Sequence, residues 1–372
     1  MSKRSLLLTL MLAFLWATYS HALDLQSISY EFSQNLDLEE MWEEWLEPDN
    51  YMSMVTPEGE IIMQTGRIIY EGDEYLTADN KLYRVVEIKD DIAYTELVEA
   101  NVDLGQEFLS LNQLRKALGL NTAEAQTDDK TGVIAIYHTH NAESYVPTDG
   151  TSSIYGKGGI HVVGSGFAEA LTNLGVEVEY SEKLHLPHDR GAYRRSRSTV
   201  LELLAKEPDA IFDIHRDAAP RDAYAAQVAD EWVTQIQFVV GRQNQNLGIN
   251  RQYAQSLKAV ADEMYPGLIK GIFFARGNYN QDLSPLNLLL EVGAHSNSRD
   301  AAVRGITLFA DVVDFYFYGP KNQRDEEINT KGSYSAIRTI LWIFLVITTI
   351  GVTYYIVNAG GWKAALARLK RR

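Results

Sequence analysis

Residues 133–145 read VIAIYHTHNAESY, and this stretch organises the rest of the chain. A run of five apolar or aromatic side chains, preceded by a threonine and a glycine, is typical of a strand buried on both faces. Two histidines and a glutamate follow directly. Because open α/β sheets bind their ligands beyond the carboxyl ends of the strands, we expect His138, His140 and Glu143 to lie at a functional site.

Two later stretches have the same form. Residues 209–217 (DAIFDIHRD) predict a short apolar strand that delivers His215, and residues 286–297 (LNLLLEVGAHSN) predict a strand that delivers Glu291. A catalytic zinc ion takes three protein ligands and leaves one position for water. Three strand ends therefore bring histidine and carboxylate side chains to one edge of a sheet, and the chain contains no cysteine that could bind the metal instead.

At these residues the sequence resembles the stage II sporulation protein P family of zinc-dependent N-acetylmuramoyl-L-alanine amidases. Three motifs carry the resemblance, at residues 138–145 (HTHNAESY), 213–217 (DIHRD) and 290–297 (LEVGAHSN). It extends over about residues 132–318. Each motif alone is a weak signal, whereas the three together are specific.

The resemblance implies a role for each chemically active residue. It makes His140, Glu143 and His215 the ligands of a Zn²⁺ ion, and Glu291 the catalytic carboxylate. His138 is the alternative to His140 as the first ligand. The motif thus predicts metal-assisted hydrolysis of an amide, with a water molecule activated by zinc and Glu291 as the general base.

Arg216 follows a predicted ligand directly, so it lies within reach of the metal. One interpretation is a salt bridge to Asp213 or Asp217. The other is a catalytic role, in which the planar guanidinium holds a substrate carboxylate or the developing oxyanion. We count Arg216 with Glu291 as a candidate catalytic residue.

The region from 132 to 320 is predicted to be the catalytic domain. Strands and helices alternate along it, which predicts an α/β fold with a mostly parallel sheet and helices on both faces. The expected strands after residue 145 are 176–180, 210–214, 233–240 and 286–290, and the expected helices are 161–174, 193–206, 246–265 and 299–315.

Residues 23–127 are predicted to form a separate N-terminal unit. Its first part, 36–46, has the apolar spacing of an amphipathic helix. Short β-type runs separated by turn residues follow, which indicates a small β-rich domain. The expected strands are 60–64, 66–70, 81–89 and 92–98.

Both ends of the chain indicate export and anchoring. Residues 1–22 have the basic start, apolar run and small-residue ending of a signal peptide, with an uncleaved anchor as the alternative. The apolar stretch 339–357 predicts a transmembrane helix at 337–357, with a buried core helix as the alternative. The tail 358–372 is rich in lysine and arginine, which predicts a cytoplasmic C-terminus and an extracytoplasmic catalytic domain in a single-pass membrane protein.

The net charge of −16 argues against nucleic acid as a partner. The resemblance instead implies peptidoglycan as the substrate, cleaved between N-acetylmuramic acid and the L-alanine of the stem peptide, and other cell-wall remodelling proteins as partners. Two alternatives stay open. One is a zinc peptidase that cuts peptidoglycan peptides, and the other is a catalytically silent wall-binding protein.

Overall fold

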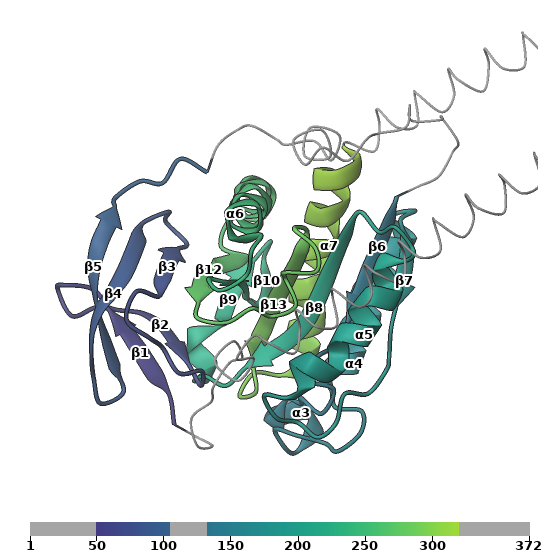
Figure 1. Ribbon diagram of the computed structural model, residues 1–372, viewed down its shortest axis with the longest axis horizontal. Coiled ribbons are helices and arrows are strands. Elements are labelled where there is room, and N and C mark those ends of the chain that lie inside the picture. The colour runs from purple at the N-terminus through teal and green to yellow at the C-terminus, as the bar shows by residue number, and fades with distance from the viewer. Residues whose placement is uncertain (1–49, 105–131, 320–372) are drawn as a thin grey trace, which may run out of the picture. The chain divides into compact units, whose positions relative to one another are not determined.

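The computed structural model describes residues 50–104 and 132–319 (Figure 1). Most of their strands form one 11-stranded sheet in the order β2-β1-β5-β4-β3-β12-β11-β13-β8-β6-β7, and β9 and β10 form a separate hairpin. The strands are β1 (Met52–Val55), β2 (Ile61–Thr65), β3 (Glu74–Thr77), β4 (Leu82–Lys89), β5 (Ile92–Glu99), β6 (Val133–Tyr137), β7 (Glu177–Tyr180), β8 (Ala210–Asp217), β9 (Ala225–Val228), β10 (Glu231–Thr234), β11 (Ile236–Gly241), β12 (Ile269–Ala275) and β13 (Asn287–Ala294). The helices are α3 (Val146–Asp149), α4 (Ile160–Asn173), α5 (Ala192–Leu204), α6 (Leu247–Met264) and α7 (Arg299–Tyr318), with a 3₁₀ turn at Arg221–Ala223.

The predicted α/β fold is confirmed, but its sheet is mixed. Strands β7, β6, β8 and β13 run parallel to one another, as expected. Strand β11 is antiparallel to β13 and parallel to β12, so the direction reverses in the middle of the sheet. The carboxyl ends of β6, β8 and β13 therefore lie at the same edge.

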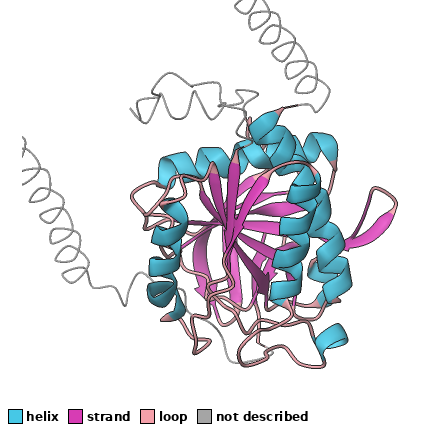
Figure 2. Ribbon diagram, turned by 90° about the vertical axis from the view of Figure 1, so that its right-hand side faces the viewer, coloured by secondary structure: helices cyan, strands magenta, loops and turns pink. Residues whose placement is uncertain are grey.

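Helices cover both faces of the sheet (Figure 2). On one face Phe167 of α4 stacks on Phe309 of α7, and both rings contact Phe212 of β8. On the other face Val200 of α5 packs in a cluster with Ile211. Since neighbouring residues of a strand point to opposite faces, Ile211 and Phe212 each anchor a different helical layer.

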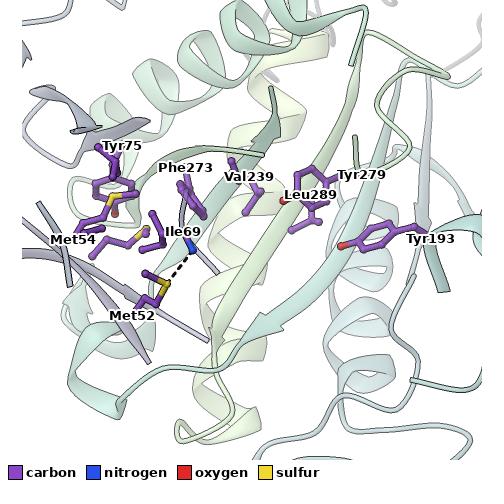
Figure 3. Close-up of a cluster of buried hydrophobic side chains, with 13 residues drawn as sticks. Met52, Met54, Ile69, Tyr75, Tyr193, Val239, Phe273, Tyr279 and Leu289 are labelled. Atoms are coloured by element: carbon purple, nitrogen blue, oxygen red, sulfur yellow. Dashed lines mark hydrogen bonds between the residues drawn. The ribbon is translucent and has the colours of Figure 1, made fainter. Parts of the chain in front are cut away.

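The β-rich segment 50–104 shares this sheet. Its strand β3 pairs antiparallel with β12, and the hydroxyl of Tyr75 donates a hydrogen bond of 3.2 Å to the carbonyl of Lys270. Figure 3 shows the buried cluster that joins the segment to the rest of the molecule, from Met52 through Phe273 to Tyr193 on α5. The sequence predicts a unit of its own here, whereas in the structure one continuous sheet and this buried cluster extend across the two regions.

Two of the predicted strands are wrong, because contacts with distant segments hold the backbone in another conformation. Residues 66–70 do not form the expected strand, because this segment turns away to contact the catalytic region, as described below. The expected strand 233–240 is two strands, β10 and β11, separated at Gln235. The backbone of Gln235 bonds instead to Tyr224 and Gly293, at 2.7 and 3.1 Å. Strands β1, β3, β9 and β12 were not predicted.

Several predicted features lie outside the described residues. They are the signal peptide 1–22, the helix 36–46, the transmembrane helix 337–357 and the basic tail 358–372. Within the described residues, 50–104 and 132–319, no helix is both long and apolar enough to cross a bilayer.

Candidate active site

Three strand ends bring the predicted site residues together. The register pairs Tyr137 of β6 with Asp213 of β8, and His215 of β8 with Glu291 of β13. The chain after β6 turns back, and Glu143 is fixed there by a β-bridge to Ser153. The side chains that the motifs single out are all buried: His140 is 1% exposed, Glu143 4%, His215 0% and Glu291 1%.

His215 is held between two carboxylates. Its Nε2 lies 3.0 Å from Oδ1 of Asp213, and its Nδ1 lies 3.4 Å from Oε1 of Glu143. Asp213 is itself fixed by the backbone NH and the hydroxyl of Thr139, at 2.8 and 2.6 Å. Burial opposes protonation of His215, but the charges of Asp213 and Glu143 outweigh it and raise its pKa to about 10. The two carboxylates therefore favour a positive charge on or beside this ring.

His140 is the next ring in the cluster. Its centroid lies 5.0 Å from that of His215 and 4.8 Å from that of His188. Burial, followed by the charge of His215, lowers the pKa of His140 well below the usual value. The ring is therefore neutral at pH 7, which is the form of imidazole that binds metals.

His138 faces another direction. Its Nδ1 lies 2.9 Å from the carbonyl oxygen of Ile214, and its Nε2 lies 2.9 Å from the hydroxyl of Tyr180. Both ring nitrogens are used in these contacts. Of the two histidines in the first motif, it is His140 that lies against His215.

His140, Glu143 and His215 offer imidazole nitrogens and a carboxylate as donors to a metal ion. Within residues 50–104 and 132–319, no group of three or more histidine, aspartate and glutamate side chains is already arranged as a metal site. The chemistry of His140, Glu143 and His215 nevertheless suits zinc, which binds nitrogen and oxygen donors. Two donors about 2.1 Å from a tetrahedral ion lie roughly 3.4 Å apart, and this is the separation of His215 Nδ1 and Glu143 Oε1.

Glu291 is paired with an arginine that the sequence analysis missed. Arg67, just after β2, makes an ion pair through Nη2 with Oε1 of Glu291. Burial raises the pKa of Glu291 to about 7, against the opposing charge of Arg67. Within the described residues, Oε2 of Glu291 is buried without a hydrogen-bond partner. One oxygen is thus held, and the other is available to accept a proton.

Arg216 does not pair with Asp213 or Asp217. Its guanidinium donates hydrogen bonds to the carbonyls of Ser144 and Ser152, at 3.2 and 2.9 Å. Its backbone NH donates to Oε2 of Glu143 at 2.9 Å, and its Nη1 lies 4.0 Å from Oε1 of the same carboxylate. Arg216 therefore fastens the loop that carries Glu143.

His188 also lies in the cluster, and no sequence motif marked it. Its Nε2 is 3.9 Å from Oε1 of Glu143, on the side of His140. Burial lowers the pKa of His188 to about 3, so the ring is neutral. Neither Arg67 nor His188 lies in one of the three motifs, and both reach the site only through tertiary contacts.

The comparisons with known proteins agree with the motifs. The model of the family described as Stage II sporulation protein P (SpoIIP) matches residues 58–314, a range that includes most of the β-rich segment. Stage II sporulation protein P of Bacillus subtilis (strain 168) is 34% identical over 213 residues, which cover 52% of this chain and 53% of that protein. The chain thus spans about half the length of this relative.

Two solved amidase structures match this chain at low identity and with low TM-scores. The N-acetylmuramyl-L-alanine amidase Ami1 from Mycobacterium smegmatis is 15% identical, with a TM-score of 0.32, over 50% of this chain and 95% of that one. The CwlD amidase from Clostridioides difficile, solved in complex with the GerS lipoprotein, is 14% identical, with a TM-score of 0.34, over 50% of this chain and 98% of that one.

Proposed function

Because the chain belongs to the stage II sporulation protein P family, we propose that it is a zinc-dependent peptidoglycan amidase. It cleaves the amide between N-acetylmuramic acid and the L-alanine of the stem peptide. The observation that carries this proposal is the buried convergence of His140, Glu143 and His215 beside Glu291, at the carboxyl ends of three strands.

The three ligands of the zinc ion would be His140, Glu143 and His215. When bound, zinc would polarise the scissile carbonyl and lower the pKa of a water molecule, so that the water loses a proton more readily and becomes a better nucleophile. Oδ1 of Asp213 lies 3.0 Å from Nε2 of His215, and this charged contact leaves Nδ1 as the nitrogen directed at Glu143. Zinc would bind the neutral form of His215, so zinc affinity should increase as pH rises through the pKa of this group.

Glu291 is the general base in this mechanism. Its free oxygen, Oε2, accepts the proton of the attacking water. The carboxyl group then delivers that proton to the nitrogen of the leaving L-alanine. A pKa near 7 suits both steps, because the group accepts and releases a proton with similar ease.

Arg216 remains a candidate for contact with the substrate. Its guanidinium lies beside the carboxylate that would bind the metal, close to where an oxyanion develops. Its bonds to Ser144 and Ser152 give it a fixed direction, as a catalytic donor requires.

The test is to incubate the purified full-length protein with sacculi, with and without a chelator, and to identify the products by mass. An amidase releases intact stem peptides that begin with L-alanine, and the chelator abolishes release. Cut peptides that remain on the glycan would identify a zinc peptidase instead. Release of nothing would identify a catalytically silent wall-binding protein.

We also propose that the protein is held in the cell membrane by a helix at 337–357, with the catalytic region outside the cytoplasm and residues 358–372 inside it. Peptidoglycan then lies on the side of the active site. Other cell-wall remodelling proteins are the proposed protein partners. The apolar stretch and the basic tail that follows it support this topology.

A further inference from the structure

We propose that Arg67 is a positioning residue of the active site, which holds Oε1 of Glu291 so that Oε2 faces the attacking water. The inference rests on the proposed function. It makes the β-rich segment a working part of the catalytic centre, although all three catalytic motifs lie beyond residue 132.

The contact itself is buried. The side chains of Arg67 and Glu291 are 7% and 1% exposed, and Nη2 of Arg67 is bonded to Oε1. Removing two charges from water costs several kcal/mol for each ion, and a buried pair often stabilises a fold no better than apolar side chains would. A contribution to stability therefore does not explain well why this ion pair is buried. A role of the two charges at the active site explains it better.

The backbone that carries Arg67 is fastened to the catalytic region. The hydroxyl of Thr65 donates a hydrogen bond of 2.8 Å to Oδ1 of Asp217, at the end of β8. A Cβ atom on Gly66 would lie 2.5 Å from Cβ of Ala218, so only glycine allows this approach. Both contacts lie within two residues of Arg67, and they fix where its side chain begins.

The guanidinium also lies near an aromatic ring. Its carbon lies 5.4 Å from the centroid of the Tyr279 ring. Tyr279 has a φ of 55°, a left-handed conformation that is uncommon for a bulky residue. Its hydroxyl donates a hydrogen bond of 2.7 Å to the carbonyl of Arg276, which holds the ring in place. Strained backbone of this kind persists where the surrounding structure enforces it, often at functional sites.

These contacts give the two carboxylate oxygens of Glu291 different roles. Oε1 is bound by Arg67, which removes the free rotation of the carboxyl group. Oε2, buried and without a hydrogen-bond partner in the described part of the chain, is the oxygen left to accept a proton. Substituting residues that orient the groups of a metal site typically costs about 10- to 100-fold in metal affinity or activity.

The experiment compares full-length Arg67→Met, Arg67→Lys and Arg67→Ala with the wild type. For each preparation, kcat and KM for stem-peptide release, bound zinc and the midpoint of thermal unfolding are measured. Arg242→Met is the matched control. Arg242 also joins the β-rich segment to the catalytic region, through bonds of 2.9 and 2.7 Å to Oδ1 of Asp73, but it does not contact Glu291.

In Arg67→Met we expect kcat to fall by about 10- to 100-fold, with KM changed less than about twofold and zinc retained. Arg67→Lys should recover part of kcat, because an ammonium restores the charge but not the planar geometry. Free guanidinium ion at millimolar concentration should raise kcat of Arg67→Ala and not of Arg242→Met. Arg242→Met should lower the unfolding midpoint without lowering kcat per zinc-loaded molecule.

Four outcomes would overturn the inference. Unchanged kcat in Arg67→Met would make the pair purely structural, as would an equal loss in Arg242→Met without guanidinium rescue. An increased kcat in Arg67→Met would mean that Arg67 inhibits the reaction. If the wild type itself releases no stem peptide, the proposed function fails and this inference fails with it, whereas an active wild type with an unaffected Arg67→Met disproves the inference alone.

Discussion

Glu143 and Glu291 are both buried glutamates at the same sheet edge, yet their neighbours differ. Glu143 lies against His215 and accepts a hydrogen bond from the backbone of Arg216, whereas Glu291 is bound on one oxygen only. We expect Glu143→Gln to lower zinc content and activity together. Glu291→Gln should keep zinc while kcat falls by roughly 100- to 10,000-fold, because an amide cannot accept the proton.

Bound zinc and amide cleavage, measured on the same preparations, check this prediction. His138→Ala is the control for general disturbance of the first motif, because both nitrogens of His138 are bonded away from the site. It should retain zinc better than His140→Ala. Zinc lost from Glu291→Gln but kept in Glu143→Gln would mean that the two roles are exchanged.

Lys270 is a buried lysine, 8% exposed, whose Nζ lies 4.4 Å from the centre of the Tyr224 ring. Burial lowers its pKa from 10.5 to about 8. The unfolded chain therefore binds a proton more tightly than the folded one, and stability increases as pH rises through this interval. Relative to Lys270→Met, the wild type should gain up to about 3 kcal/mol of unfolding free energy between pH 8 and 10.5.

Denaturant titrations at pH 7 and pH 10 measure this gain. Lys258 is the matched contrast, since it is also buried but bonds to Ala78, Asn80 and Asp262 at 3.0, 2.8 and 2.5 Å. Lys258→Met should destabilise the protein at pH 7, because it leaves these acceptors without their donor. Parallel pH profiles for the wild type and Lys270→Met would contradict the prediction.

At the scale of the element, strand β13 carries a bulge directly after its catalytic residue. The register with β8 shifts between Glu291 and Ala294, and Gly293 has a φ of 74°. A Cβ atom at Gly293 would lie 2.7 Å from Cγ2 of Thr234. Bulges near active sites commonly set the direction of a side chain, and here the bulge follows Glu291 by two residues.

Gly293→Ala should therefore destabilise the protein by more than about 2 kcal/mol and lower kcat, because strain and collision act together on β13. Gly175→Ala is the control. Gly175 has a φ of 89° but no atom within 4 Å of an added Cβ, so it should cost only about 1 kcal/mol of backbone strain and leave kcat unchanged. Chemical denaturation and initial rates distinguish the two variants, and equal effects would count against the bulge as an alignment device.

At the scale of the whole molecule, the motif residues all lie before residue 298, far from the proposed membrane helix at 337–357. A chain that ends at residue 332 should therefore be released from the membrane and keep its activity towards sacculi. A reporter fused after Arg372 should be active only if it functions in the cytoplasm. Fractionation and reporter assays check both statements, and an externally active C-terminal reporter would reverse the proposed topology.

The sequence by itself determined the family, the α/β class and the residues gathered at the edge of the sheet. It could do so because an apolar strand followed by histidine or glutamate is a local pattern, and parallel strands place their carboxyl ends together. Only the tertiary structure decided that His140 rather than His138 faces His215, and that the β-rich segment adds its strands to the catalytic sheet. It alone placed Arg67 on Glu291, 224 residues away in the chain. Such a contact depends on how distant segments pack, and short-range spacing does not encode it.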